Sequence, residues 1–147
     1  MTKTYLIEGN FMPLARHRAS QGKFYDAWAH SNLIFTSVLE AQHMKDRRFQ
    51  GTVAIKALFY LDFPDGMGQG RRMGMDNKYH TTRPTLGALM KAVEDLCTGL
   101  LFEDPAIIVS MLIEKRLSVT PRLELIISEV KDAKRDGSEE KTPQRDD

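Results

Sequence analysis

Apolar positions along the chain follow two different periods. From Thr52 to Asp62 an apolar residue recurs at every second position, which is typical of a β-strand with one buried face. From Leu86 to Leu100 apolar residues recur at intervals of three and four, which predicts an amphipathic helix. Pro84 before this segment and Gly99 near its end are common residues at helix boundaries. The chain therefore combines strand and helix patterns.

Weaker patterns of the same two kinds complete the expected fold. They predict three more strands, at Thr4 to Glu8, Ile107 to Lys115 and Leu123 to Val130, and one more helix at Tyr25 to Lys45. A turn around Thr120 and Pro121 separates the last two strands, which we expect to pair as a hairpin. This order predicts an α+β domain, in which a small mixed sheet of about four strands carries two main helices on one side.

Two stretches between these elements show neither period. Residues 9–23 read as a polar loop, and residues 64–82 read as a second loop that holds four glycines and three methionines. A loop as long as the second one is usually functional or mobile in a compact domain. After Val130 the chain has no large apolar residue, so we expect a folded domain at residues 1–130 and a disordered charged tail at residues 131–147.

Charge and composition narrow the classes of function. Lys and Arg total 21 and Asp and Glu total 20, so the net charge of +1 does not indicate a nucleic-acid or membrane partner. Cys97 is the single cysteine, which excludes an internal disulfide and fits the reducing cytoplasm. No apolar run is long enough to span a membrane, and the four histidines and one cysteine lack the paired spacing of a zinc site. We expect a cytoplasmic protein without a membrane partner.

Carboxylates are the first candidates for catalysis. Glu103 and Asp104 follow the helix of residues 86–100 and precede a predicted strand. Converging carboxylates hold Mg²⁺ in enzymes that cleave phosphodiesters, although a solvated turn around Pro105 explains the same pair. Lys91 and Asp95 are four residues apart on the helix, so an ion pair within the helix is their simplest interpretation.

Basic residues gather in both predicted loops and just before the second helix. Such residues could bind phosphates, and the candidates are Arg16, Arg18, Lys23, Arg71, Arg72 and Arg83. Clustered basic loops can also serve solubility alone. The chain contains no P-loop, no dinucleotide-binding fingerprint and no nucleophile elbow.

Several motifs stand in a fixed order between Tyr5 and Val130. They are I-E-G-N-F-M-P-L-A-R-H-R from Ile7, the residues Lys23, Phe24 and Tyr25, and G-T-V-A-I-K-A-L-F-Y-L from Gly51. The most specific one, from Arg83 to Asp104, reads R-P-T-L-G-A-L-M-K-A-V-E-D-L-C-T-G-L-L-F-E-D. In this order and spacing they resemble the RusA family of Holliday-junction resolvases, which are small homodimeric, Mg²⁺-dependent endonucleases often encoded by phages and prophages.

The family pattern in the last motif is K/R-P-D-x-D-N-L-x-K-x-x-x-D-x-L, followed by a glycine and an acidic pair. The positions that match it are Pro84, Leu89, Lys91, Asp95, Leu96, Gly99, Glu103 and Asp104, while Lys115 and the run from Pro121 fit the family's closing hairpin. The resemblance implies that Asp104 and Lys91 are catalytic and that Asp104 and Glu103 bind metal. It also adds Lys91 and Lys115 to the residues that contact DNA.

The chain departs from the pattern where the family binds metal. Thr85, Gly87 and Ala88 replace two aspartates and an asparagine. A threonine hydroxyl is a weak Mg²⁺ ligand and glycine offers none, whereas Thr85 is well suited to cap the helix. The expectation is a homodimer that binds branched DNA and four-way junctions in recombination and repair, with its nuclease activity lost or weakened. Mg²⁺ would be its cofactor only if it is active.

Two alternatives remain open at this point. An active resolvase could use relocated ligands, with Asp76 and Asn77 approaching Asp104 and His80 nearby. The fold could instead be an interaction module that binds a recombination or replication protein. A bacterial or phage origin is expected from the resemblance.

Overall fold

The computed structural model describes residues 1–11, 18–20, 23–25, 27–43 and 47–131. Its centre is a sheet with the strand order β1 (Thr2–Glu8), β6 (Arg122–Glu129), β4 (Val53–Leu61) and β5 (Ile108–Leu117). β4 and β5 are parallel, and β6 runs antiparallel to β1 and β4. The mixed four-stranded sheet is the one that the sequence predicts.

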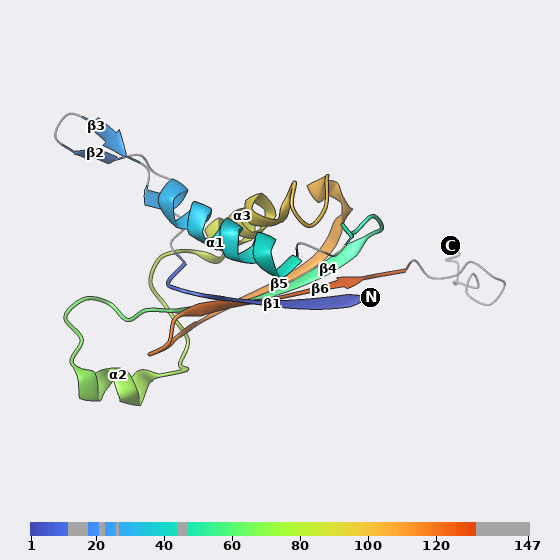
Figure 1. The fold of residues 1–147 in the computed structure, drawn as a ribbon. Helices are drawn as coiled ribbons and strands as arrows, with labels where there is room; N and C mark the ends of the chain where they lie inside the picture. Colours follow the sequence, from blue (N-terminus) through green and yellow to red (C-terminus); the bar gives the residue numbers. More distant parts are fainter. Residues whose placement is uncertain (12–17, 21–22, 26, 44–46, 132–147) are drawn as a thin grey trace, which may run out of the picture.

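Two helices lie on the same face of this sheet, as Figure 1 shows. α1 (Ala27–His43) contacts β1, and α3 (Leu86–Cys97) contacts β5. The core between helices and sheet is formed by alternate strand residues and by one side of α3; its largest fully buried members include Phe59, Leu89, Leu96, Leu123, Leu125 and Ile127. The expected α+β architecture is confirmed.

The predicted pairing of the last two strands is wrong. β6 lies between β1 and β4, and β5 lies on the other side of β4, so β5 and β6 are not neighbours. The connection between them crosses the end of β4, where the Ser118 N–H donates to the Leu61 carbonyl at 2.9 Å. In this central position β6 buries Leu123, Leu125 and Ile127 completely between the sheet and the helices.

Both predicted loops contain short elements that periodicity does not reveal. The two-stranded hairpin of β2 (Arg18–Ser20) and β3 (Lys23–Tyr25) begins in the first loop and ends beyond it, so Tyr25 closes a strand and does not begin the helix as predicted. The second loop holds α2 (Gln69–Met75). α2 has no buried residue, so no apolar stripe marks it in the sequence. In Figure 1 it projects from one end of the sheet, away from α1 and α3.

Three further expectations concern the chain as a whole. Cys97 is fully buried, and burial raises the pKa of its thiol far above the usual range, as expected for an inert core cysteine. Within the described ranges no helix is long and apolar enough to cross a membrane. The charged tail lies outside the described residues apart from Lys131, and the proposed domain boundary remains a prediction.

Candidate nucleic-acid interface

The N-terminal end of α3 carries the residues that depart from the family pattern. Thr85 is the N-cap, and its hydroxyl oxygen accepts a hydrogen bond from the Ala88 N–H at 3.3 Å. No acidic residue lies in the first turn, and a side chain added at Gly87 would meet open space. The capping role predicted for Thr85 is confirmed, and this helix end keeps its partial positive charge.

Lys115 fixes the chain that enters α3. Its Nζ donates to the Thr82 carbonyl at 2.5 Å and to the Pro84 carbonyl at 2.6 Å, which joins the C-terminal part of β5 to the start of the helix. Burial lowers the pKa of Lys115. The lysine therefore positions the helix end and adds positive charge beside it.

His80 lies next to this lysine and is buried. Burial and then the charge of Lys115 lower the pKa of its imidazole, so His80 is neutral near pH 7. A cavity of about 270 Å³ opens beside it, between the end of β4 and the segment that enters α3. Arg83, Asp62 and Asp65 also line this cavity, so its wall carries both signs of charge.

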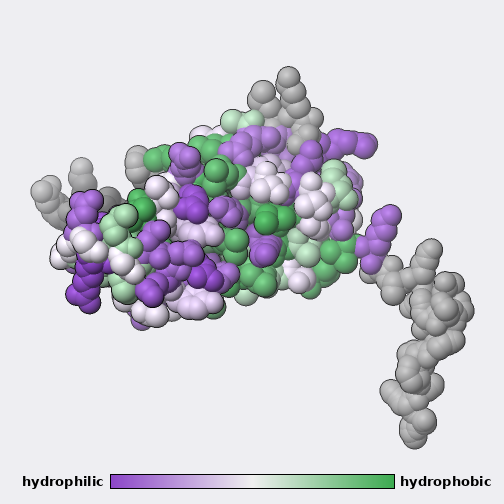
Figure 2. All heavy atoms as spheres, turned by 90° about the horizontal axis from the view of Figure 1, so that it is seen from below, coloured by the Kyte–Doolittle hydropathy of each residue, from purple (hydrophilic) through white to green (hydrophobic). Residues whose placement is uncertain are grey.

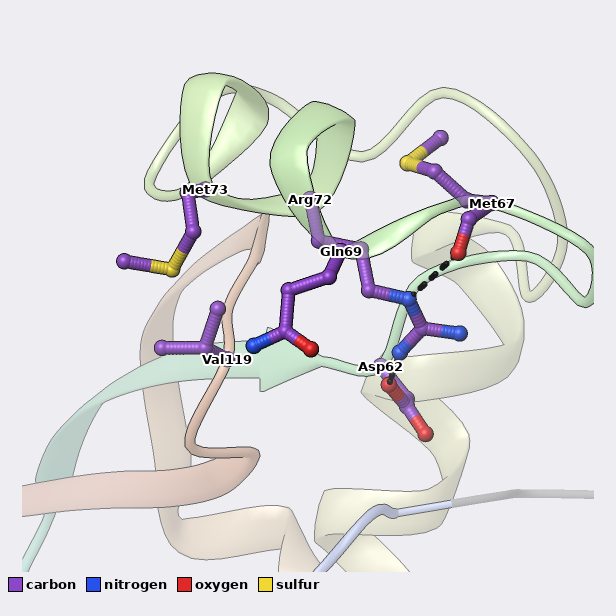
Figure 3. A pocket seen from close by; sticks show the side chains of 6 residues that line it. All are labelled: Asp62, Met67, Gln69, Arg72, Met73 and Val119. Carbon is purple, nitrogen blue, oxygen red and sulfur yellow. Dashed lines mark hydrogen bonds and ion pairs between the residues drawn. The ribbon is translucent and has the colours of Figure 1, made fainter.

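The basic residues of α2 do not behave alike. Arg71 is exposed, but Arg72 turns back toward the sheet, as Figure 3 shows. Its Nε donates to the Met67 carbonyl at 2.8 Å, its Nη1 lies 3.5 Å from the Asp62 carboxylate, and its guanidinium stands 5.4 Å from the centroid of the Phe63 ring. Arg72 therefore anchors α2 at the edge of a cavity of about 380 Å³.

Glu103 and Asp104 lie at the opposite end of α3. Glu103 pairs with Arg48 at 3.0 Å, and Arg48 also donates to the Gly99 carbonyl. Asp104 accepts from the Ala106 N–H at 2.9 Å and caps the short helix η1 (Pro105–Ile107). Since α3 has twelve residues, roughly 18 Å of helix separates Thr85 from this acidic pair.

Lys91 lies between these two ends on the exposed side of α3. Its Nζ is 3.3 Å from a carboxylate oxygen of Asp95, and both side chains are largely exposed. The ion pair within the helix is therefore present, as the spacing predicts. Within one chain the acidic pair, Lys91 and the helix start form a line along α3 and do not converge on a single point.

The structure covers the remaining predicted DNA contacts only in part. Arg16 lies outside the described residues, and Arg18 and Lys23 are described as backbone positions in β2 and β3. Arg83 and Lys115 lie together at the start of α3. Among the described residues, no group of three His, Cys, Asp or Glu side chains could hold a metal ion.

A comparison with protein families decides the relationship. The family model described as endodeoxyribonuclease RusA matches residues 12–128, which is most of the chain. The chain belongs to the RusA family. Membership in the RusA family implies a function in the resolution of Holliday junctions and in DNA recombination and repair, with a Mg²⁺-dependent endonuclease as the family activity. No curated protein matches this sequence.

Two arginine–tyrosine stacks lie at one end of the sheet, and the candidate site residues predicted from the sequence do not include them. The Arg116 guanidinium lies 4.5 Å from the centroid of the Tyr79 ring, and the Arg122 guanidinium lies 3.8 Å from that of Tyr60. Tyr60 stands opposite Arg122 on β6 and opposite Arg116 on β5. Tyr60, Arg116 and Arg122 therefore point to the same face of the sheet. That the two arginines flank Tyr60 can be recognised only once the strand order β6, β4, β5 is known.

Proposed function

We propose that this RusA-family protein binds branched DNA as a homodimer and that its nuclease activity is lost or much weakened. The observation that carries the proposal is the composition of the α3 start, where Thr85 caps the helix and neither Gly87 nor Ala88 offers a ligand. The family chemistry needs carboxylates at this place. The residues present do not fit a Mg²⁺ site of that kind.

Charge at the start of α3 supports binding of phosphate. A helix N-terminus presents N–H groups and a partial positive charge, and no carboxylate of the first turn opposes it. Arg83 and Lys115 add two cationic side chains beside that end. A phosphate would therefore meet attraction where a metal-binding relative has two negative charges.

The acidic pair gives little support to a metal site. Glu103 is already paired with Arg48, and Asp104 accepts from the Ala106 N–H. Mg²⁺ prefers near-octahedral oxygen coordination and is rarely fixed by one free carboxylate. The Asp104 oxygen that does not accept from Ala106 could supply one ligand. Waters or phosphate oxygens would have to supply the other ligands of Mg²⁺.

Relocated ligands find no support at Asp76. The Asp76 carboxylate accepts from the Val119 N–H at 2.8 Å, just beyond the C-terminal end of β5. Asp104 lies before the N-terminal end of that ten-residue strand, so roughly 30 Å of strand separates the two carboxylates in one chain. Asp76 therefore serves the β5–β6 connection and does not approach Asp104.

The proposal is tested by a gel-shift titration in EDTA with a four-way junction and a linear duplex of the same base composition. We expect a clear preference for the junction that weakens steeply with salt. Arg83→Ala should weaken binding about threefold to tenfold, and Lys56→Ala, on the open face of the sheet, is the matched control. Equal affinity for both DNAs would contradict the proposal and would favour an interaction module for another protein.

Cleavage is tested separately by incubating the junction with Mg²⁺ or Mn²⁺. We expect no symmetric nicking of the junction, or nicking so slow that most of the bound junction stays uncut. Symmetric nicks that disappear in Asp104→Asn would instead show an active resolvase, because that substitution keeps the cap on η1 and removes only the negative charge.

A further inference from the structure

The cavity beside His80 combines an apolar wall with polar groups. It has a volume of about 270 Å³, and its lining includes Leu61 and Phe63, which are only 2% and 5% exposed, and the rings of Pro64 and Pro84. Small-molecule sites are mostly apolar and carry a few placed polar groups, and those for drug-sized ligands measure about 300–1,000 Å³. This cavity therefore fits a single flat ring system.

The polar residues of the lining offer donors and acceptors to such a ring. His80 is 7% exposed, and its Nδ1 has no hydrogen-bond partner among the described residues, which is rare for a buried polar atom. Because the imidazole is neutral near pH 7, one ring nitrogen donates and the other accepts. The Asn10 Oδ1 accepts from the Asp62 N–H at 2.8 Å, which leaves the Asn10 NH₂ group to donate. The exposed carboxylate of Asp65 adds an acceptor.

Charge distinguishes this cavity from the neighbouring start of α3. The helix start attracts phosphate through its N–H groups, Arg83 and Lys115. The cavity is lined by the carboxylates of Asp62 and Asp65, which repel phosphate and accept hydrogen bonds from N–H groups. Arg83 belongs to both places, because it lines the cavity and directly precedes the entry to α3. A nucleotide whose phosphate lies at the helix start would therefore find a place for its base beside it.

The sheet face opposite α1 and α3 is less suited to a nucleotide. Figure 2 shows apolar side chains among the polar ones on this face. The arginines of its two arginine–tyrosine stacks are already paired with carboxylates, Arg116 with Glu114 at 2.8 Å and Arg122 with Glu124 at 3.3 Å. These carboxylates compete with phosphate for the guanidinium groups.

We propose that the cavity beside His80 holds one base that leaves the stack at the centre of a branched DNA, with guanine preferred. This inference rests on the binding of branched DNA in the proposed function and adds a second contact to it. Extrusion costs least for a base that is unpaired or poorly stacked, as at a point of strand exchange. Guanine presents N1–H and N2–H side by side to a carboxylate such as that of Asp65, and its O6 accepts from an NH₂ group such as that of Asn10.

Base binding is tested without DNA, by NMR titration of the intact protein with guanosine monophosphate and with ribose 5-phosphate, which lacks the base. We expect the backbone amide signals of Phe63 and His80 to shift with the nucleotide alone. Thr82→Trp fills the cavity from an exposed position and should abolish these shifts. Thr81→Trp, at the adjacent exposed threonine outside the lining, is the matched control and should keep them. Equal shifts with both ligands, or shifts that survive in Thr82→Trp, overturn the proposal.

The preference for guanine is tested in the same titration with adenosine monophosphate. We expect the guanine nucleotide to bind at least about fivefold more tightly. Asp65→Asn keeps the size of the side chain and should remove most of this difference, whereas Glu40→Gln, an exposed position on α1, should not. Equal affinity of the parent protein for the two nucleotides contradicts the preference.

Extrusion of the base is tested by gel shift in EDTA, with four-way junctions that carry either guanine or an abasic nucleotide next to the crossover. We expect the parent and Thr81→Trp to bind the guanine junction at least about fivefold more tightly, and Thr82→Trp to bind both alike. A parent that prefers junctions to duplex but binds both junctions equally overturns this inference and leaves the proposed function in place. Binding of guanosine monophosphate in the cavity without any preference for junctions contradicts the proposed function instead.

Discussion

The two ends of α3 differ in how their polar groups are used. At the N-terminal end, Thr85 caps the helix and Lys115 braces the incoming chain, while the first turn stays free of carboxylates. At the C-terminal end both acids have protein partners, Arg48 for Glu103 and the backbone of η1 for Asp104. The N-terminal end is thus stabilised without a carboxylate, whereas the carboxylates at the C-terminal end form an ion pair and a helix cap. The start of α3 is therefore capped and braced without the carboxylates of the family pattern.

The strongest test of this contrast restores the carboxylates. In Thr85→Asp/Gly87→Asp, aspartate is as good an N-cap as threonine, and a side chain at position 87 meets open space. Aspartates in the first turn also interact favourably with the helix dipole. We expect a folded protein with tighter Mn²⁺ binding and junction nicking at least about a hundredfold above the parent rate.

The control for this gain is Thr85→Asn/Gly87→Asn, which keeps size and capping without charge. Mn²⁺ binding is measured by calorimetry and junction nicking by a gel assay. The parent and both double variants are compared at the same protein concentration. A double aspartate variant that stays folded and binds junctions, yet neither binds Mn²⁺ nor cuts, would show that the missing carboxylates are not what limits activity.

The second test removes the brace at the N-terminal end. Lys115→Met deletes the two charge-assisted hydrogen bonds to the Thr82 and Pro84 carbonyls while keeping most of the side-chain volume. We expect a loss of about 1–3 kcal/mol in the free energy of unfolding and a weaker affinity for junctions. Urea denaturation and gel shift measure the two effects. Lys56→Met, on the exposed sheet face, should change neither by a comparable amount.

The third test addresses the other end and should have a smaller effect. Asp104→Ala removes the acceptor for the Ala106 N–H, so we expect a loss of about 1 kcal/mol in the free energy of unfolding. Asp104→Asn retains an acceptor oxygen and should restore most of that loss. If both variants were as stable as the parent, the capping bond would contribute nothing, and Asp104 would be free for another role.

The sequence predicts most of the fold because the strong patterns coincide with the buried faces. β4 and α3 show clean periods, and both bury the side chains that carry those periods. The position of β6 is not predicted, because a short connection suggests a hairpin and only the core shows that β6 belongs at the centre. α2 is missed since it buries nothing.

In the candidate site, too, the sequence predicts local contacts and does not predict contacts between distant segments. The capping role of Thr85 is local and can be predicted from its place between Pro84 and Leu86, the first residue of the helix. The partners of Lys115 and Glu103 come from distant segments, so no spacing in the sequence indicates them. Contacts that join chain segments far apart depend on the strand order, and the strand order is the part of the fold that the sequence leaves open.

The smallest expected effect concerns His80, the neutral group beside the positive end of α3. Its pKa is lowered by burial and by Lys115, so between that lowered value and about 6.5 the unfolded chain binds more protons than the folded one. The free energy of unfolding should therefore fall as pH drops below about 6.5, and His80→Gln should flatten this dependence. Lys115→Met should flatten it in part, because one cause of the shift is removed. Urea titrations at several pH values measure the slopes, and a parent slope that His80→Gln leaves unchanged would assign the dependence to other groups.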